Sequence, residues 1–350
     1  MTNEAVPEDP TQIFYKLTPE RVLTAVEGFG VRCTGRCLAL NSMENRVYEL
    51  ELEAELSQAG LSQAGLSADE QPNIFRVAKF YRPGRWTREQ IQAEHTFMAD
   101  LVEADVPVVA PIADHSGSTI RETGELGIFV ALFPKARGRN PDELSDEHLE
   151  WMGRLLARLH LVGARTPAPS RLTLNAETYG VKNLEYLQST NALPLEVKSG
   201  YQEVVSQICE LYSNATKNTA LQRIHGDCHQ GNILWGSEGP FFLDFDDMVM
   251  GPAVQDLWLL ISGRDEDGRR QLQSILSGYE QMRDFDRKQL RLIEGLRALR
   301  YINYAAWIAR RWEDPMFKRV FPHFGTVNYW QSQVADLREQ LDLFREALES

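Results

Sequence analysis

Two short polar segments in the second half of the chain carry residue types that can do chemistry. The first is HGDCHQGN, residues 225–232, and the second is FLDFDD, residues 242–247. Mg²⁺ prefers oxygen ligands, and Asn232 and Asp244 each supply a side-chain oxygen. A carboxylate such as Asp227 can orient the hydroxyl that attacks a phosphate, or accept its proton. These residue types together favour phosphoryl transfer.

The spacing of these residues narrows the chemistry further. Asp227 and Asn232 follow the pattern D-x-x-x-x-N, the spacing of the protein-kinase catalytic loop. Apolar residues at 233–234 and 241–243 predict a short hairpin that presents Asn232 and Asp244 toward one ion. Any one of the three polar residues alone would more often be a turn or cap residue. The three of them at this spacing, between apolar strands, favour a functional site.

The two segments resemble the signature of the aminoglycoside/choline kinase superfamily, which shares the two-lobed protein-kinase fold. Within that superfamily, the wider sequence is similar to a bacterial family of serine/threonine protein kinases. The stretches that carry the resemblance are LNSMENRVYEL, VAKFYRPGRWT, EHTFMADL, VPVVAPI, HGDCHQGNILW, DDMVMGPAVQDLW and AAWIARRWEDP. The resemblance implies an ATP-dependent and Mg²⁺-dependent enzyme that phosphorylates protein serines and threonines, its own included, and protects cells under stress.

The resemblance also implies a role for each residue of the two segments. Asp227 would orient the acceptor hydroxyl or take its proton, while Asn232 and Asp244 would hold Mg²⁺ against the phosphates. Asp246 is open to two interpretations, an auxiliary metal ligand or an anchor behind the ligands. Asp256 would brace the catalytic loop, or else would only favour the N-terminus of a helix.

Residues in the first half of the chain are expected to bind the nucleotide. Lys79 lies in an apolar stretch that echoes the V-A-I-K strand, whose lysine holds the α- and β-phosphates. Glu94, on a helix that follows, is the candidate partner of Lys79. No glycine-rich loop is present between the first two expected strands, and the turn with Ser42 would contact phosphate instead. The backbone around Phe133 would bind adenine.

Composition limits the classes of partner. The chain has 37 basic and 50 acidic residues, a net charge of −13, which disfavours non-specific nucleic-acid binding. The N-terminus has no apolar core of a signal peptide, and no apolar run is long enough to cross a membrane. The four cysteines form no C-x-x-C pair. We therefore expect a cytoplasmic monomer with reduced thiols and no membrane partner.

The pattern of elements predicts an α+β fold with two lobes. We expect an N-terminal arm over residues 1–16 and a nucleotide-binding lobe with an antiparallel sheet over 17–134. A repeated LSQAG segment predicts a flexible hairpin insertion at 54–72. Long amphipathic helices from about residue 144 predict a larger helical lobe over 135–350 that carries the catalytic loop, the metal site and the substrate side.

Two other functions remain open from the residues alone. One is a small-molecule kinase acting on an aminoglycoside, choline or homoserine, which the acidic charge of the chain would suit. The other is a pseudokinase that binds nucleotide and serves as a scaffold. The tryptophans and arginines of residues 307–312 lie at helical spacing, which is more typical of a core than of a substrate-binding wall.

Overall fold

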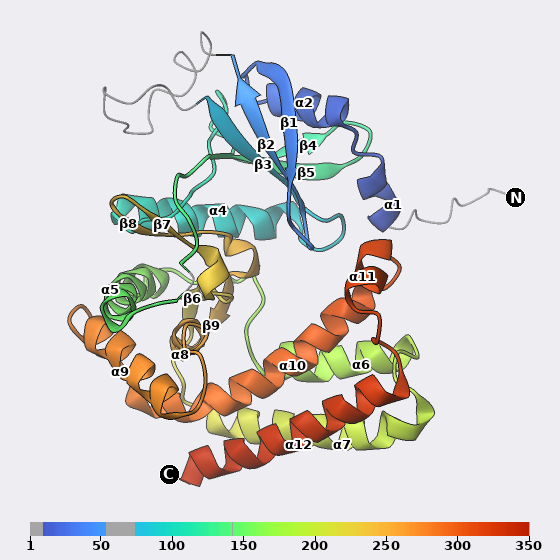
Figure 1. The fold of residues 1–350 in the computed structure, drawn as a ribbon, viewed down its shortest axis with the longest axis vertical. Coiled ribbons are helices and arrows are strands. Elements are labelled where there is room, and N and C mark those ends of the chain that lie inside the picture. Colours follow the sequence, from blue (N-terminus) through green and yellow to red (C-terminus); the bar gives the residue numbers. More distant parts are fainter. Residues whose placement is uncertain (1–9, 54–73, 142, 350) are drawn as a thin grey trace, which may run out of the picture. The chain divides into compact units, whose positions relative to one another are not determined.

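The computed structural model describes residues 10–53, 74–141 and 143–349 (Figure 1). These residues form two compact units. The first unit runs to Arg139 and also includes Leu234–Asp246, and the second comprises Asn140–Ile233 and the chain from Asp247 onward. This division differs from the expected limit at residue 134, because residues 135–139 and 234–246 group with the first unit. The expected insertion at 54–72 lies outside the described residues.

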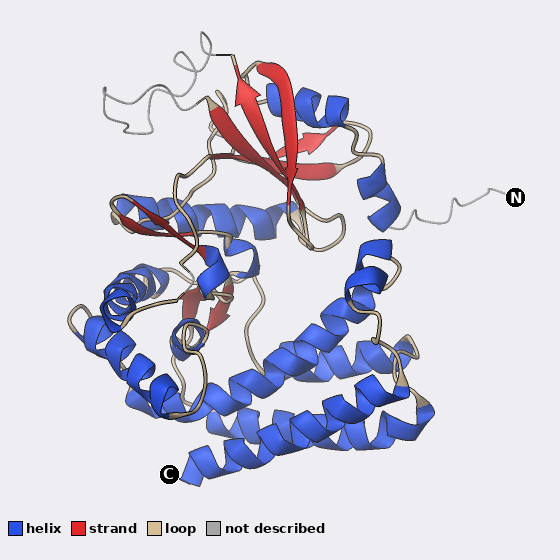
Figure 2. Ribbon diagram, in the orientation of Figure 1, coloured by secondary structure: helices blue, strands red, loops and turns tan. Residues whose placement is uncertain are grey.

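One antiparallel five-stranded sheet forms the frame of the first unit, with the strand order β1-β2-β3-β5-β4 (Figure 2). The strands are β1 (Cys33–Leu40), β2 (Arg46–Leu52), β3 (Phe75–Phe80), β4 (Arg121–Thr123) and β5 (Ile128–Pro134). Strand β5 is apolar along its length because both of its faces are covered. Ile128, Val130 and Leu132 join the core on one face of the sheet, whereas Ala131 joins a second cluster on the other.

Among the described residues of this unit, three helices accompany the sheet. They are α1 (Pro10–Tyr15), α2 (Pro19–Glu27) and α4 (Arg88–Glu103). Helix α4 begins with a capping box, a motif recognisable in the sequence Thr87-Arg-Glu-Gln90, because the Thr87 side chain accepts from the Gln90 amide and the Gln90 side chain accepts from the Thr87 amide. The expected arm over residues 1–16 is wrong for its last part. Phe14 on α1 is only 3% exposed and belongs to the core of the unit.

The second unit is mostly helical. Its helices are α5 (Asp146–Gly163), α6 (Lys182–Ser189), α7 (Leu195–Ala215), α8 (Val254–Trp258), α9 (Glu266–Glu280), α10 (Ile293–Arg310), α11 (Pro315–Val320) and α12 (Val327–Glu349). The apolar face predicted on α5 is buried, including Leu149, Met152 and Leu156. Antiparallel sheet followed by helices confirms the predicted α+β fold class.

Short strands surround the two polar segments. Strands β6 (Gln222–Ile224) and β9 (Val249–Gly251) pair in antiparallel fashion within the second unit. Strands β7 (Ile233–Gly236) and β8 (Gly239–Phe242) form the predicted hairpin. Asn232 precedes this hairpin and Asp244 follows it, so both polar segments adjoin short strands.

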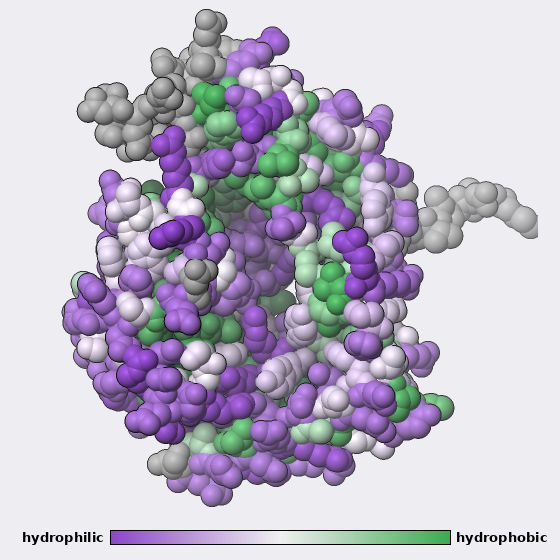
Figure 3. Space-filling view, viewed as in Figure 1, coloured by the Kyte–Doolittle hydropathy of each residue, from purple (hydrophilic) through white to green (hydrophobic). Residues whose placement is uncertain are grey.

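Two features of the structure agree with the sequence composition, namely a largely hydrophilic surface and cysteines without disulfide bonds. Hydrophilic residues cover most of the face drawn in Figure 3, with smaller groups of hydrophobic residues between them. All four cysteines are free thiols. None of the helices in the described ranges combines the length and apolarity needed to span a membrane.

Candidate active site

The catalytic loop begins with a glycine that no other residue could replace without strain. Gly226 has a φ of +84°, and a Cβ atom on it would lie 2.2 Å from the carbonyl oxygen of Asp247. This tight turn places Asp227 directly after the buried strand β6. The residue type at position 226 is therefore dictated by the backbone path that Asp227 requires.

A buried carboxylate braces this loop from α8. Asp256 is 0% exposed, and its oxygens accept hydrogen bonds from the amides of His225 at 2.9 Å and Gly226 at 2.8 Å. The Nε2 atom of His160 lies 3.0 Å from Asp256, and the other ring nitrogen of His160 lies 3.1 Å from the Tyr279 hydroxyl. Of the two interpretations of Asp256, the structure supports the brace.

Asp227 is held by two positively charged or polarisable groups. Arg300 on α10 donates a hydrogen bond to its Oδ1 atom at 2.8 Å, and the His229 ring lies 3.4 Å from its Oδ2 atom. Burial by itself raises the pKa of the Asp227 carboxyl, but His229 and Arg300 outweigh it and lower the pKa to about 2. The carboxylate is thus ionised at neutral pH. The sequence carries no signal for Arg300, which is 73 positions away.

Asn232 is fixed within the same loop. Its amide nitrogen donates to the carbonyl oxygen of Asp227 at 3.0 Å, so the oxygen of this side chain is the atom suited to a metal ion. Asn140 supports the loop from outside by donating to the carbonyl oxygens of Gly231 and Ile233, both at 2.9 Å. The loop therefore holds Asp227 and Asn232 in one rigid arrangement within the second unit.

Lys79 is the centre of a charged group in the first unit. Its ammonium lies 2.8 Å from Asp244, 3.1 Å from Asp246 and 3.6 Å from Glu94. The side chain is only 8% exposed. Burial by itself lowers the pKa of Lys79, but the three carboxylates outweigh it and raise the pKa well above its ordinary value. Lys79 is thus a permanently charged group that faces the predicted metal ligand.

The two carboxylates of the second polar segment differ in their surroundings. The Asp244 side chain is 52% exposed, and its backbone adopts a φ of +53°, which is unusual for a residue other than glycine. The Asp246 side chain is 4% exposed and contacts Lys79 through Oδ1 and Arg85 through Oδ2. Asp246 therefore fits the interpretation of an anchor, and Asp244 is the carboxylate with room for a ligand.

Two arginines from the loop that follows β3 hold the turn with Ser42 in place. The Arg82 guanidinium donates to the carbonyl oxygens of Met43 and Glu44 at 3.1 Å and 2.9 Å. The Ser42 hydroxyl accepts from the Asn45 amide at 3.3 Å. Arg85 lies 3.4 Å from the Glu44 carboxylate. Because Arg85 also contacts Asp246, it links this turn to the charged group around Lys79.

Glu94 on α4 belongs to a buried polar chain that sequence reasoning missed. Its Oε1 atom accepts from the Tyr81 hydroxyl at 3.3 Å, and that hydroxyl lies 2.9 Å from Nε2 of His95. The other ring nitrogen of His95 lies 2.7 Å from the Thr119 hydroxyl. In the sequence Tyr81 stands between Phe80 and Arg82, and only its position two residues after Lys79 could have indicated its role.

Phe133 lies in β5, where it pairs with Val77 of β3. Its ring packs edge-on against His95 at 6.3 Å between centroids. The amide of Ile112 donates to the carbonyl oxygen of Leu132 at 2.6 Å. The carbonyl oxygen of Leu132 thus already accepts one hydrogen bond from within the protein.

Comparison with known proteins supplies the family. Residues 66–293 match the model of a family described as "Phosphotransferase enzyme family". Stress response kinase A of Escherichia coli (strain K12) is 36% identical over 334 residues, which cover 95% of each chain. The chain belongs to the phosphotransferase enzyme family, in the branch of stress response kinase A. A further relative of this kinase is the serine/threonine protein kinase RdoA of Salmonella typhimurium, 36% identical over 95% of each chain.

Solved structures have the same fold as this kinase. Amicoumacin kinase hAmiN, in complex with AMP-PNP, Ca²⁺ and Ami, superposes with a TM-score of 0.67 at 16% identity, covering 94% of this chain and 95% of that one. A microcompartment-associated aminopropanol kinase superposes with a TM-score of 0.65 at 17% identity, covering 94% and 97%. The two-lobed kinase-like fold expected from the sequence is thereby confirmed.

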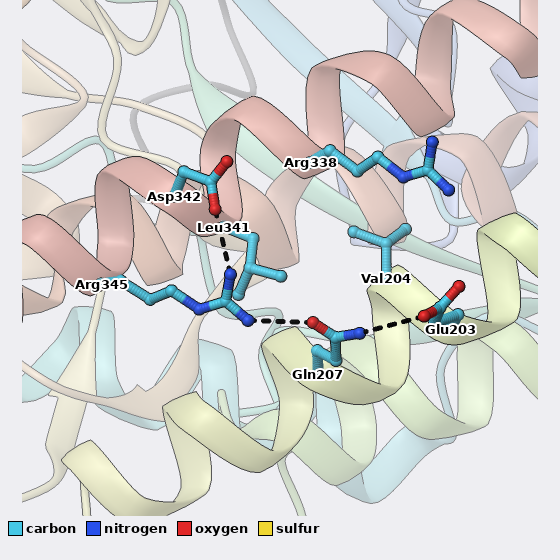
Figure 4. A pocket seen from close by; sticks show the side chains of 7 residues that line it. All are labelled: Glu203, Val204, Gln207, Arg338, Leu341, Asp342 and Arg345. Atoms are coloured by element: carbon cyan, nitrogen blue, oxygen red, sulfur yellow. Dashed lines mark hydrogen bonds and ion pairs between the residues drawn. The ribbon is translucent and has the colours of Figure 1, made fainter.

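A separate pocket of this kinase lies between α7 and α12 and has a volume of about 180 Å³ (Figure 4). Arg345 donates to Gln207 at 2.9 Å and to Asp342 at 3.0 Å. Gln207 in turn donates to Glu203 at 3.5 Å. These polar side chains satisfy one another, and none of the expected site residues lines the pocket. The pocket therefore has no part in the site described above.

Proposed function

We propose that this kinase transfers the γ-phosphoryl group of ATP, with Mg²⁺ bound, to serine or threonine hydroxyls of proteins, its own included. The observation that carries the proposal is the loop in which Asp227, ionised and held by Arg300, lies in one rigid arrangement with Asn232. Phosphoryl transfer needs little covalent chemistry from the protein, so positioned charges of this kind supply most of the catalysis.

The nucleotide would lie against the charged group of the first unit. Lys79 would neutralise the α- and β-phosphates, and Glu94 would hold the ammonium in place. The hydroxyl and backbone amide of Ser42 would contact phosphate oxygen. The backbone from Phe133 onward would bind adenine, with Val77 and Ile112 beside the ring.

Asn232 and Asp244 are the residues that would hold the metal. Both are oxygen donors, as Mg²⁺ requires, and Asp244 is half exposed and so accessible to an ion. When bound by Asn232 and Asp244, Mg²⁺ would neutralise negative charge on the phosphates of ATP. The hairpin β7–β8 between the two residues supports a shared site, since a hairpin returns the chain toward its starting end.

Asp227 would receive the acceptor hydroxyl. The hydroxyl oxygen attacks the γ-phosphorus, the bond to the β–γ bridging oxygen breaks, and ADP leaves with that electron pair. The hydroxyl proton passes to Asp227 and then to solvent. Because the pKa of Asp227 is about 2, its main contribution is to orient the hydroxyl, and the proton moves late in the reaction.

A small-molecule acceptor is the second candidate. The solved structures with this fold include an amicoumacin kinase and an aminopropanol kinase, and the net charge of −13 would suit a cationic substrate. The curated relatives at 36% identity weigh more, because the solved structures are below 20% identical. A pseudokinase is disfavoured because every expected ligand type is present. A role in the stress response, a cytoplasmic location and a monomeric state are further parts of the proposal.

The acceptor class can be tested directly. Radiolabelled ATP and Mg²⁺ are offered to the purified kinase with a generic basic protein, and separately with a panel of aminoglycosides and amino alcohols. We expect label on the basic protein and on the kinase itself, and none on the panel above the level without enzyme. If label went only to a small molecule, the proposal of a protein acceptor would be wrong, whereas the assignment as a phosphotransferase would stand.

A further inference from the structure

Helix α10 carries a half-exposed aromatic surface beside the catalytic loop. The rings of Tyr304 and Trp307 stack with centroids 5.4 Å apart and planes 15° apart. Phe321, just after α11, meets both rings edge-on at about 6 Å. We call Tyr304, Trp307 and Phe321 the aromatic platform. Tyr304 is 48% exposed, and aromatic side chains that are grouped at the surface are typical of sites that bind a partner.

The platform is continuous with the site of reaction. Arg300, the residue that donates to Asp227, precedes Tyr304 by four positions and Trp307 by seven, so all three lie on one face of α10. At 1.5 Å per residue, the two rings lie roughly 6 and 10 Å along the helix from Arg300. A molecule that touches Asp227 can therefore also reach the platform, provided that it is long enough.

This length excludes the smallest acceptors. An extended peptide advances about 3.3 Å per residue, so the span corresponds to about two to three residues, or to four where the peptide is not fully extended. A two-carbon amino alcohol is about as long as one residue and cannot reach both Asp227 and the rings. A peptide with a large apolar or aromatic side chain near its serine or threonine fits both the length and the chemistry of the platform.

We propose that the aromatic platform is the docking surface for the acceptor peptide, and that it selects an aromatic or large aliphatic residue two to four positions from the phosphorylated serine or threonine. The proposal rests on the proposed function and names its substrate class. The half-exposed ring of Tyr304 stacks against the side chain of the peptide. Arg300 keeps its hydrogen bond to Asp227. The serine or threonine hydroxyl is therefore phosphorylated at the end of the platform nearest Arg300, which is its N-terminal side along α10.

The test is a series of soluble peptides, each with one serine and one phenylalanine, in which the phenylalanine moves from four positions before the serine to four positions after it. The reference peptide has glycine in its place. For the wild-type kinase we expect kcat/KM to rise about tenfold when phenylalanine is two to four positions away on one side. Tyr304→Ala should abolish this preference by raising KM for the favoured peptide, with KM for ATP unchanged.

Tyr301 supplies a matched control. It lies on the same helix and is 41% exposed, but is not part of the platform. Tyr301→Ala should keep the wild-type peptide preference, and unchanged thermal unfolding of both variants would exclude a folding defect. Three results would overturn the docking surface: the same kcat/KM for every peptide, a preference for phenylalanine only next to the serine, or a preference that survives Tyr304→Ala. In each of these cases, phosphorylation of the peptides would still support the proposed function. No phosphorylation of any peptide or protein would overturn both.

Discussion

The ammonium of Lys79 lies 2.8 Å from Oδ1 of Asp244, although the two residues are 165 positions apart in the sequence. The lysine that would grip the phosphates thus directly faces the carboxylate that would hold the metal. In the described structure this lysine also contacts Asp246 and Glu94, so three carboxylates lie around one ammonium, and Arg85 contacts one of the three, Asp246. Loss of the Lys79 charge would therefore leave these carboxylates without this cation and would also remove the proposed contact with the phosphates.

Replacing this lysine should therefore affect both binding and catalysis. We expect Lys79→Met to lower kcat/KM for ATP by about a hundredfold or more, because a positioned charge on the phosphates is lost. Lys217→Met, at an exposed position of the second unit, is the matched control and should behave as wild type. Steady-state kinetics with varied ATP measures both. A Lys79→Met enzyme with wild-type kcat/KM would remove this lysine from the site.

Tyr81 is predicted to position Glu94. Its hydroxyl contacts Glu94 and His95, and the Lys79 ammonium lies 4.8 Å from the centre of its ring. Tyr81→Phe keeps the ring but leaves Glu94 without this donor, so we expect kcat/KM for ATP to fall about tenfold while the fold is retained. Tyr48→Phe, on the neighbouring strand β2, should leave kcat/KM unchanged. Equal kinetics of the two variants would show that the Tyr81 hydroxyl has no such role.

The hydrogen bonds that Asp256 makes to the catalytic loop should contribute measurably to the free energy of unfolding. Asp256 accepts from two backbone amides and contacts His160 while fully buried. Asp256→Ala removes this shared buried acceptor, and we expect the free energy of unfolding to fall by about 3 kcal/mol together with a loss of phosphoryl transfer. Urea unfolding measures the first effect, with the exposed Asp336→Ala as control. Unchanged unfolding would mean that the loop does not depend on Asp256.

Asp114 predicts a pH dependence of stability. Burial by itself raises the pKa of this carboxyl, but hydrogen bonds from Ser116 and Ser118, together with Arg121, outweigh it and lower the pKa to about 2 from an ordinary 3.8. A carboxyl with a lowered pKa stabilises the fold above its ordinary pKa and loses this contribution as the pH falls toward 2. Asp114→Asn should thus be less stable than wild type by about 1 kcal/mol at pH 7, after allowance for solvent screening.

The difference between Asp114→Asn and wild type should shrink below pH 3.8. Thermal unfolding of both proteins between pH 7 and pH 3 measures it. A difference that stays constant over this range would show that the ionised carboxylate does not stabilise the turn.

Local patterns in the sequence predicted the elements well. The spacing of apolar residues on α5 and the capping box at Thr87 act over one or two helical turns, and a hairpin needs only neighbouring strands. Helix α1 was missed because its six residues are too short for a helical repeat, and Phe14 is buried only through packing against distant strands. Residues whose structure is set by near neighbours can be predicted from the sequence.

Site residues that belong to a sequence motif could be proposed from the sequence. Residues that join the site only through tertiary contacts could not. The motifs made Asp227, Asn232 and Lys79 the candidate site residues, and their roles stay predictions. Nothing in the sequence pairs Arg300 with Asp227 or Arg85 with Asp246, because a charged residue on a helix or loop has many possible partners until the fold selects one. The interpretation of Asp246 could be decided only after both of its oxygens were seen to contact cations.

The central claim is that this chain moves the γ-phosphoryl group of ATP with the help of Asp227, Asn232 and Asp244. The most direct measurement is transfer of labelled phosphate from ATP to a protein acceptor, with and without Mg²⁺, by the wild type and by Asp227→Asn and Asp244→Ala. We predict transfer by the wild type only when Mg²⁺ is present, and loss of transfer in both variants with their folds intact by circular dichroism. Transfer at the wild-type rate by either variant, or by the wild type without any divalent ion, would contradict the account.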